Sequence, residues 1–116
     1  MSPTEDAAGS WLVLDGRVLA TLEAAHTRRE RRRGLLGRDS VEGVMLLEPA
    51  RSVHTFGMRF PIDVVHLDAD RQVLRIVTMR PNRLGRPVRR SRSVIECEAG
   101  AMARWGVRPG DELEVR

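Results

Sequence analysis

Short runs of apolar residues separated by turn residues dominate the chain, and this pattern is typical of a β-rich domain. The first two runs, residues 11–14 and 17–22, flank the dipeptide Asp15-Gly16. Gly accepts the positive φ that a tight hairpin turn requires, so these residues predict a β-hairpin. The apolar pattern predicts further strands at residues 43–47, 62–67, 72–79, 94–98 and 112–115.

Two short segments carry helix signals instead. Residues 27–30 read Thr-Arg-Arg-Glu, which places Thr at the N-cap and Glu three residues later, as in a capping box. We therefore predict a helix over residues 28–36, with Gly37 as the left-handed residue that ends it. A second short helix is predicted over residues 99–105, ended by Gly106. The fold class predicted is a small β-rich α+β domain, barrel-like, with about seven short strands and two short helices.

The length of 116 residues fits one domain, which we place at residues 11–116 after a flexible N-terminal tail at residues 1–10. The hydrophobic fraction of 41% is ordinary for a globular chain. Residues 1–10 lack a basic region followed by an apolar one, and no apolar run reaches the length of a membrane span. We therefore expect no signal peptide and no membrane contact, and the default location is cytoplasmic.

The net charge of +4 is concentrated in two arginine clusters, at residues 27–33 and 80–92. The first holds five Arg and one Glu, and the second holds six Arg and no acidic residue. Such clusters attract polyanions. However, the chain lacks the interleaved aromatic residues and the helix-turn-helix or RNP-like motifs of nucleic-acid binders. We therefore expect solvated, salt-bridged surfaces and no nucleic-acid binding, and keep polyanion binding as an alternative.

The most specific stretch is residues 52–68, which contains both Phe residues of the chain and two of its three His. Phe56, Met58 and Phe60 alternate, so on an extended strand they would share one face. Such a stripe belongs either to the core or, if it lines a cleft, to a small-molecule or peptide site.

Four polar residues are candidates for chemistry: His54, Asp63, His66 and Glu96. Imidazole and carboxylate groups can share a proton or bind a Zn ion. Side chains alternate along the strand at residues 62–67, so Asp63 and His66 should point to opposite faces. Structural roles are the favoured explanation of these residues, such as a turn cap for Asp63 and an internal ion pair for Glu96. We predict no metal and no cofactor.

Cys97 is the single cysteine, so an internal disulfide is excluded. It would be a candidate nucleophile if His54 or His66 lay within hydrogen-bond reach. Its alternation with Ile95 places it in the core instead, where free Cys is common. We expect a structural role.

Three separated blocks resemble the DUF192 family, also called UPF0127. They are residues 33–38, residues 54–68, and residues 94–100 leading on to residues 105–111. The blocks follow the order and spacing of the family from about residue 17 onward. The resemblance implies a compact β-rich domain with a helix near its start, and it implies no activity, because the family is named for lacking a known one.

One position departs from the family pattern. Many family members carry Trp-Met where this chain has Gly57-Met58. The change removes a large ring, so a pocket at this position should be wider or differently shaped. Some relatives carry an export signal, whereas this chain shows none.

Together these observations predict a non-catalytic ligand- or peptide-binding module with a pocket around residues 54–68. The expected ligand contacts are His54, Phe56, Met58, Phe60, Asp63 and Glu96. The alternative is a small hydrolase-like or metal-dependent enzyme that uses His54 with Asp63 or Glu96. The expected partner is a small molecule or a protein or peptide, and the chain should be a monomer or a weak dimer.

Overall fold

The computed structural model describes residues 10–116, and their elements match the predicted fold class. In chain order these are β1 Trp11–Leu14, β2 Arg17–Ala25, α2 Arg28–Arg33, β3 Val44–Leu47, β4 Ile62–Leu67, β5 Val73–Met79, β6 Ser93–Glu98, α3 Ala101–Trp105 and β7 Glu114–Val115. The predicted tail at residues 1–10 lies outside the described residues, except for Ser10. Over residues 10–116, neither helix has the length and apolarity needed to cross a membrane.

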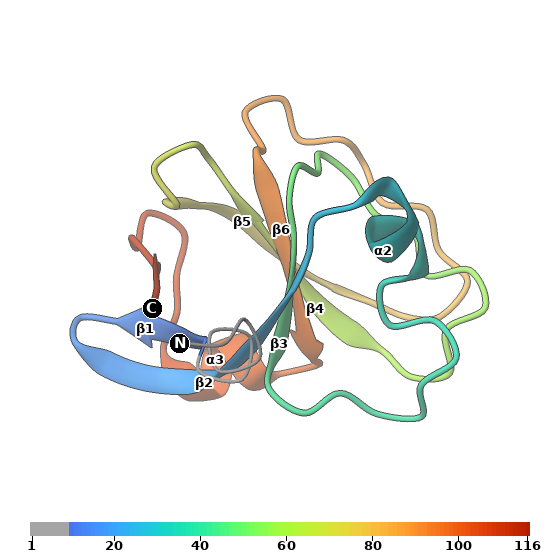
Figure 1. Cartoon of the computed structure of the whole chain (residues 1–116), viewed down its shortest axis with the longest axis horizontal. Helices are drawn as coiled ribbons and strands as arrows, with labels where there is room; N and C mark the ends of the chain where they lie inside the picture. The colour runs from blue at the N-terminus through green and yellow to red at the C-terminus, as the bar shows by residue number, and fades with distance from the viewer. Residues whose placement is uncertain (1–9) are drawn as a thin grey trace, which may run out of the picture.

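The seven strands form one sheet in the order β5-β4-β6-β3-β2-β1-β7. The two ends of this sheet approach each other. Val73 N–H donates to the carbonyl of Asp111 at 2.8 Å, and Gly110 N–H donates to the carbonyl of Val73 at 2.8 Å. An isolated bridge between Gln72 and Glu112 lies beside these bonds. The sheet therefore curves into the partly closed barrel visible in Figure 1.

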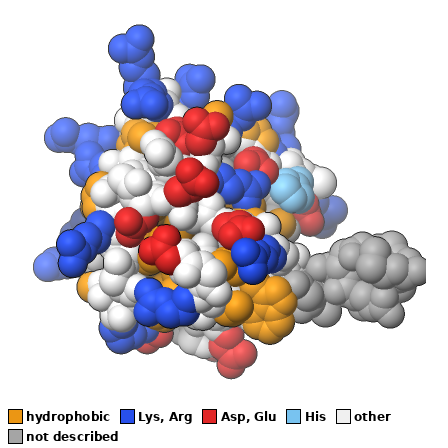
Figure 2. Space-filling view, turned by 90° about the vertical axis from the view of Figure 1, so that its left-hand side faces the viewer, with side chains coloured by type: hydrophobic (Ala, Val, Ile, Leu, Met, Phe, Trp, Pro, Cys, Tyr) orange, Lys and Arg blue, Asp and Glu red, His pale blue; other side chains and the backbone are white. Residues whose placement is uncertain are grey.

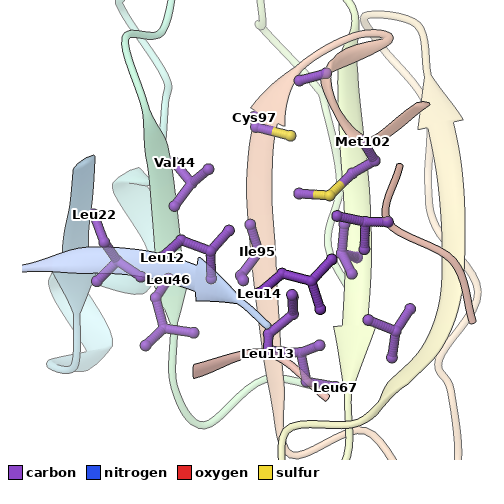
Figure 3. Close-up of a cluster of buried hydrophobic side chains, with 14 residues drawn as sticks. Leu12, Leu14, Leu22, Val44, Leu46, Leu67, Ile95, Cys97, Met102 and Leu113 are labelled. Atoms are coloured by element: carbon purple, nitrogen blue, oxygen red, sulfur yellow. The ribbon is translucent and has the colours of Figure 1, made fainter. Parts of the chain in front are cut away.

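The central strands β3, β4 and β6 are buried on both faces. Their inner face contributes Val65 and Ile95 to a cluster that fills the barrel (Figure 3). Their outer face contributes Val64 to a second cluster, where Leu35 packs beneath the loop that follows α2. Burying one such side chain contributes about 1.5–3 kcal/mol, so a one-residue slip of the register would be costly. The alternation predicted for residues 62–67 is confirmed.

β2 is longer than predicted and extends to Ala25. Its last four residues, 22–25, pair in parallel with residues 44–47 of β3. The local sequence Leu-Glu-Ala-Ala favours helix by propensity, and the sheet pairing overrides this preference. The other strand bounds agree with the predictions to within two residues.

The start of α2 is as predicted, but its end is not. Thr27 Oγ1 accepts a hydrogen bond from Glu30 N–H at 3.0 Å, and Glu30 Oε1 accepts one from Thr27 N–H at 2.9 Å. The capping box is therefore confirmed. The predicted end after Leu36 is wrong, because the helix stops at Gly34, where φ is 45°. Gly37 also has a positive φ, of 83°, but it lies in the turn that follows.

Candidate functional site

The outer face of the sheet is only partly covered, and a hollow of about 320 Å³ remains beside α2. We call it the α2 pocket. It is bordered by α2 and residues 34–36, by residues 49–50 and 52–54, and by Leu47, Met58 and Glu96. This volume lies at the lower end of the range for small-molecule sites, about 300–1,000 Å³.

Glu96 brings a largely buried carboxylic acid side chain to the α2 pocket. It lies on β6, and the side chain is only 5% exposed. Among the described residues, no group donates a hydrogen bond to its carboxyl and no Arg forms an ion pair with it. Burial raises the pKa of Glu96 to about 7. The carboxyl group is therefore partly protonated near neutral pH, and it can donate or accept a hydrogen bond.

Arginines of α2 form one side of the α2 pocket. The four that border it are Arg28, Arg31, Arg32 and Arg33. These arginines come directly after the capping box. Because Thr27 fixes where the helix begins, it also determines which helix residues border the pocket. The opposite side of the molecule, over β1, β2 and β7, carries acidic and basic side chains intermixed (Figure 2). The first arginine cluster is therefore local to the pocket.

Val53 and His54 form a wall of the α2 pocket, and buried Thr55 follows them in the chain. Buried Thr55 fixes this wall, because its Oγ1 donates to the carbonyl of Arg80 at 2.6 Å and accepts from Arg83 N–H at 2.8 Å. Thr55 N–H donates to the carbonyl of Arg83 at 2.8 Å. A bridge between His54 and Leu84 continues the pairing. Residues 53–55 are thus held against the second arginine cluster.

His54 and Phe56 are both exposed and lie next to each other. Their rings stack with centroids 5.1 Å apart. His54 Nδ1 accepts a hydrogen bond from Phe56 N–H at 3.2 Å, so the proton of a neutral His54 ring is on Nε2. Phe56 is 49% exposed. Of these two predicted contacts, His54 borders the α2 pocket and Phe56 lies on the surface beside it.

The predicted stripe of Phe56, Met58 and Phe60 does not form, because the chain turns at Phe56-Gly57 instead of running extended. Gly57 has a φ of 79° at this turn. Met58 is buried and borders the α2 pocket. Phe60 is half-buried against the outer cluster and borders a different hollow, with Pro61.

Asp63 lies on the inner face of the sheet, away from the α2 pocket. Its register partner is Cys97, whereas Glu96 pairs with Val64. Thr78 Oγ1 donates to Asp63 Oδ1 at 2.7 Å, and Met102 N–H donates to Asp63 Oδ2 at 3.2 Å. Both carboxylate oxygens are therefore used, and the second one caps the start of α3.

His66 lies on the same face of the sheet as Glu96 but borders a second hollow, next to β5. Burial, and then the charge of Arg75, lower the pKa of His66. Cys97 is fully buried on the inner face, and burial followed by the charge of Asp63 raises its pKa to about 12. Within residues 10–116, no three His, Cys, Asp or Glu side chains are grouped so that they could hold a metal ion.

Of the ligand contacts predicted from the sequence, three border the α2 pocket: His54, Met58 and Glu96. The sequence analysis did not identify Gly34, which also borders it, or Thr55, which anchors residues 53–55. Gly34 lies directly against Glu96 at the border of the α2 pocket, and a Cβ atom at this position would lie 3.2 Å from Glu96 Oε1. The block at residues 33–38 did contain this glycine, but it gave no indication of the strand that the glycine would face.

Comparison with known sequences finds one family. A sequence model of DUF192, described as "Uncharacterized ACR", matches residues 12–115. A UPF0127 protein of Pyrococcus abyssi (strain GE5 / Orsay) is 35% identical over 63 residues, which are 54% of this chain and 54% of that protein. The match thus spans about half the length of this curated relative.

Two crystal structures have a similar fold. A protein of unknown function from Novosphingobium aromaticivorans DSM 12444 has a TM-score of 0.77 and 23% identity, covering 90% of this chain and 82% of that one. A protein of Sinorhizobium meliloti 1021, described as a proposed transcription regulator, has a TM-score of 0.79 and 26% identity, covering 91% of each chain. These similarities support the same barrel-like architecture.

Proposed function

The chain belongs to the uncharacterised DUF192 family, and on that premise we propose that it is a non-catalytic module that binds a small ligand in the α2 pocket. The observation that carries the proposal is Glu96, which is 5% exposed, borders the pocket and has no hydrogen-bond or ion-pair partner among the described residues. A buried polar group without a partner costs free energy. A ligand that forms a hydrogen bond with it would recover this cost.

The charges around the α2 pocket favour an anionic or neutral ligand over a cation. Four arginines border the pocket, against one carboxyl group. Since burial raises the pKa of Glu96 to about 7, even that group is partly neutral. The protonated carboxyl group can donate a hydrogen bond to a carbonyl or carboxylate oxygen of the ligand.

The remaining lining favours a ligand with an apolar part. Leu35, Leu47 and Met58 border the pocket on the side of the outer cluster. Small-molecule sites commonly combine such apolar walls with a few polar groups that orient the ligand. The ligand class that fits is a small carboxylic acid with an apolar body.

The arrangement gives less support to catalysis. His54 Nδ1 is already engaged by Phe56 N–H, and Asp63 is on the other face of the sheet. A hydrolase would require a base and a partner that orients it. Of the predicted carboxylate partners of His54, only Glu96 borders the same pocket.

The proposal can be tested by measuring whether the protein binds hexanoate, benzoate and hexanamide. Changes in NMR chemical shifts and isothermal titration calorimetry measure the binding. We expect saturable binding that perturbs the amide of Gly34 and the methyl group of Met58. Ser52→Trp, at an exposed position that borders the pocket, should abolish it. Ala103→Trp, at an exposed position of α3 that borders none of the hollows described, is the matched control and should bind as the wild type does.

Two results would overturn this function. One is that none of the three probes binds, or that Ser52→Trp and Ala103→Trp weaken binding equally. The other is that the wild type hydrolyses 4-nitrophenyl hexanoate and the His54→Ala variant does not. That result would support the alternative of a small hydrolase.

A second candidate function is polyanion binding through the two arginine clusters. The description of the Sinorhizobium meliloti relative as a proposed transcription regulator favours it. Against it, the helices among residues 10–116 have six and five residues, which is short for a recognition helix. Binding of a fluorescent DNA duplex that weakens steeply with salt would support this candidate, and no binding at low salt would exclude it.

A further inference from the structure

A second hollow lies on the outer face of the sheet, and the charged residues that border it are all arginines. It has a volume of about 340 Å³, and we call it the β5 pocket. Four arginines border it: Arg75 on β5, and Arg80, Arg83 and Arg86 in the loop that follows. No Asp or Glu is among the residues that border it.

The guanidinium groups of these arginines are free to bind a ligand. Among the described residues, every ion pair is made by other arginines. Arg83 makes one weak contact, from Nη1 to the carbonyl of Asn82 at 3.4 Å. A guanidinium group matches the geometry of a carboxylate or phosphate group and can bind it through two parallel hydrogen bonds.

His66 adds a nitrogen that accepts hydrogen bonds. Ser91 Oγ donates its single proton to the carbonyl of Ala50 at 2.9 Å or to that of Ser93 at 3.3 Å. When the hydroxyl proton is on a carbonyl, the hydroxyl accepts from His66 Nδ1, which lies 3.1 Å away. In that tautomer the ring proton is on Nδ1, and Nε2 is an acceptor to which no described residue donates. Burial, and then the charge of Arg75, lower the pKa of His66 and so favour the neutral form of the ring.

The loop that carries three of the arginines is held in place. Thr55 binds the carbonyl of Arg80 and the N–H of Arg83. At Gly85 the backbone approaches so closely that a Cβ atom would lie 2.7 Å from the carbonyl oxygen of Val53. Gly85 N–H donates to that same oxygen at 2.9 Å. The arginines therefore start from a backbone that is already positioned, which lowers the entropic cost of binding.

The walls of the β5 pocket are apolar. Val53, Val77 and Met79 border it, and Leu84 stands at its edge with 75% of its side chain exposed. An ionic ligand without an apolar part would leave these side chains in water. The site therefore suits an anion attached to an apolar body.

We propose that the β5 pocket is a second binding site, which takes a small organic anion, either a phosphomonoester or a carboxylate with an apolar body. Arg75 and Arg80 bind the oxyanion, and His66 Nε2 accepts a hydrogen bond from a hydroxyl group of the ligand. Apart from Val53, which borders both hollows, the side chains of this site differ from those of the α2 pocket, so the two proposals can be tested separately.

Titration with phenyl phosphate and with phenylacetate, at an ionic strength of about 0.15 M so that distant charges are screened, tests the site and identifies the preferred oxyanion. We expect one of the two to bind saturably and to perturb the amides of Arg75 and Thr78 and the Nε2 resonance of His66. Arg75→Gln and Arg80→Gln should each weaken binding about tenfold, as expected for the loss of one charge-assisted contact. Ser52→Trp, which blocks the α2 pocket, should leave this binding unchanged.

The matched control is Arg89→Gln. Arg89 belongs to the same arginine cluster, and its substitution removes the same charge. It borders a hollow near Asp68 instead of the β5 pocket. We expect less than about a twofold effect, because a distant exposed charge is largely screened. Equal losses for Arg80→Gln and Arg89→Gln would overturn the proposal, since they would indicate a diffuse cationic surface. Failure of both probes to bind at millimolar concentration would overturn it as well.

Discussion

Gly34, at the end of α2, lies directly against the carboxyl group of Glu96 on β6, so that a Cβ atom on residue 34 would stand 3.2 Å from Glu96 Oε1. The two residues are far apart in sequence and belong to different elements. Their approach places the turn after α2 over the polar group of the α2 pocket. Gly34 also has a φ of 45° and a ψ of −123°, a conformation that a residue with a side chain rarely adopts.

Gly34→Ala should destabilise the protein by about 1–3 kcal/mol, because it combines backbone strain with the contact to Glu96. Removing the carboxyl group should relieve only the contact. In a double-mutant cycle with Glu96→Ala, measured by urea unfolding, we expect a coupling energy of about 0.5–1 kcal/mol. A coupling energy of zero would mean that the effect of Gly34→Ala is entirely conformational.

Glu96 should make the protein less stable as the pH rises. Burial raises its pKa from 4.5 to about 7, so between these values the folded state retains a proton that the unfolded state releases. The free energy of unfolding therefore falls over this interval, by on the order of 3 kcal/mol, and the stability is fully retained below it. Urea unfolding of the wild type and of Glu96→Gln at a series of pH values measures the difference. If the two pH profiles run parallel, the pKa is not raised.

Asp63 should act as a structural residue. Asp63→Ala removes the acceptor of both Thr78 Oγ1 and Met102 N–H, and we expect a loss of about 2–3 kcal/mol in urea unfolding. Asp63→Asn should cost less, because the amide oxygen still accepts one of the two bonds. Exposed Asp70, whose carboxyl group accepts no hydrogen bond among the described residues, provides the control Asp70→Ala. A loss of hexanoate binding in folded Asp63→Asn would contradict the structural role.

Cys97 should be unreactive in the native protein. Its pKa is raised from 9.0 to about 12, so the thiolate fraction near neutral pH is lower by about a thousandfold. We expect Ellman's reagent to label Cys97 rapidly in 8 M urea, about the concentration that unfolds small domains, and only at the rate of unfolding in buffer. Labelling in buffer that is faster than unfolding would show that the thiol is accessible.

The local elements of this fold were predictable because their signals act over a few neighbouring residues. Asp15 and Gly16 both adopt the positive φ, 51° and 76°, that the hairpin turn required. The capping box at residues 27–30 fixed the start of α2 through two hydrogen bonds within one turn. The alternation of residues 62–67 followed from strand geometry alone.

The extents of two elements were not predictable in the same way. β2 continues through residues 22–25 because β3 offers a parallel partner. α2 stops at Gly34, before two leucines that sequence reasoning had assigned to the helix; one of them, Leu35, packs in the outer cluster. In both places a contact made far along the chain outweighs a local preference that is worth a fraction of a kcal/mol per residue.

The sequence by itself determined the family resemblance, the β-rich class and the residue types of the central stretch. Only the tertiary structure decided which of those residues meet. The antiparallel register of β4 and β6 pairs Val64 with Glu96 and Asp63 with Cys97, and so sends the two carboxyl groups to opposite faces of the sheet. The physical reason is that register is set by burying both apolar clusters at once, a condition that involves strands distant in sequence.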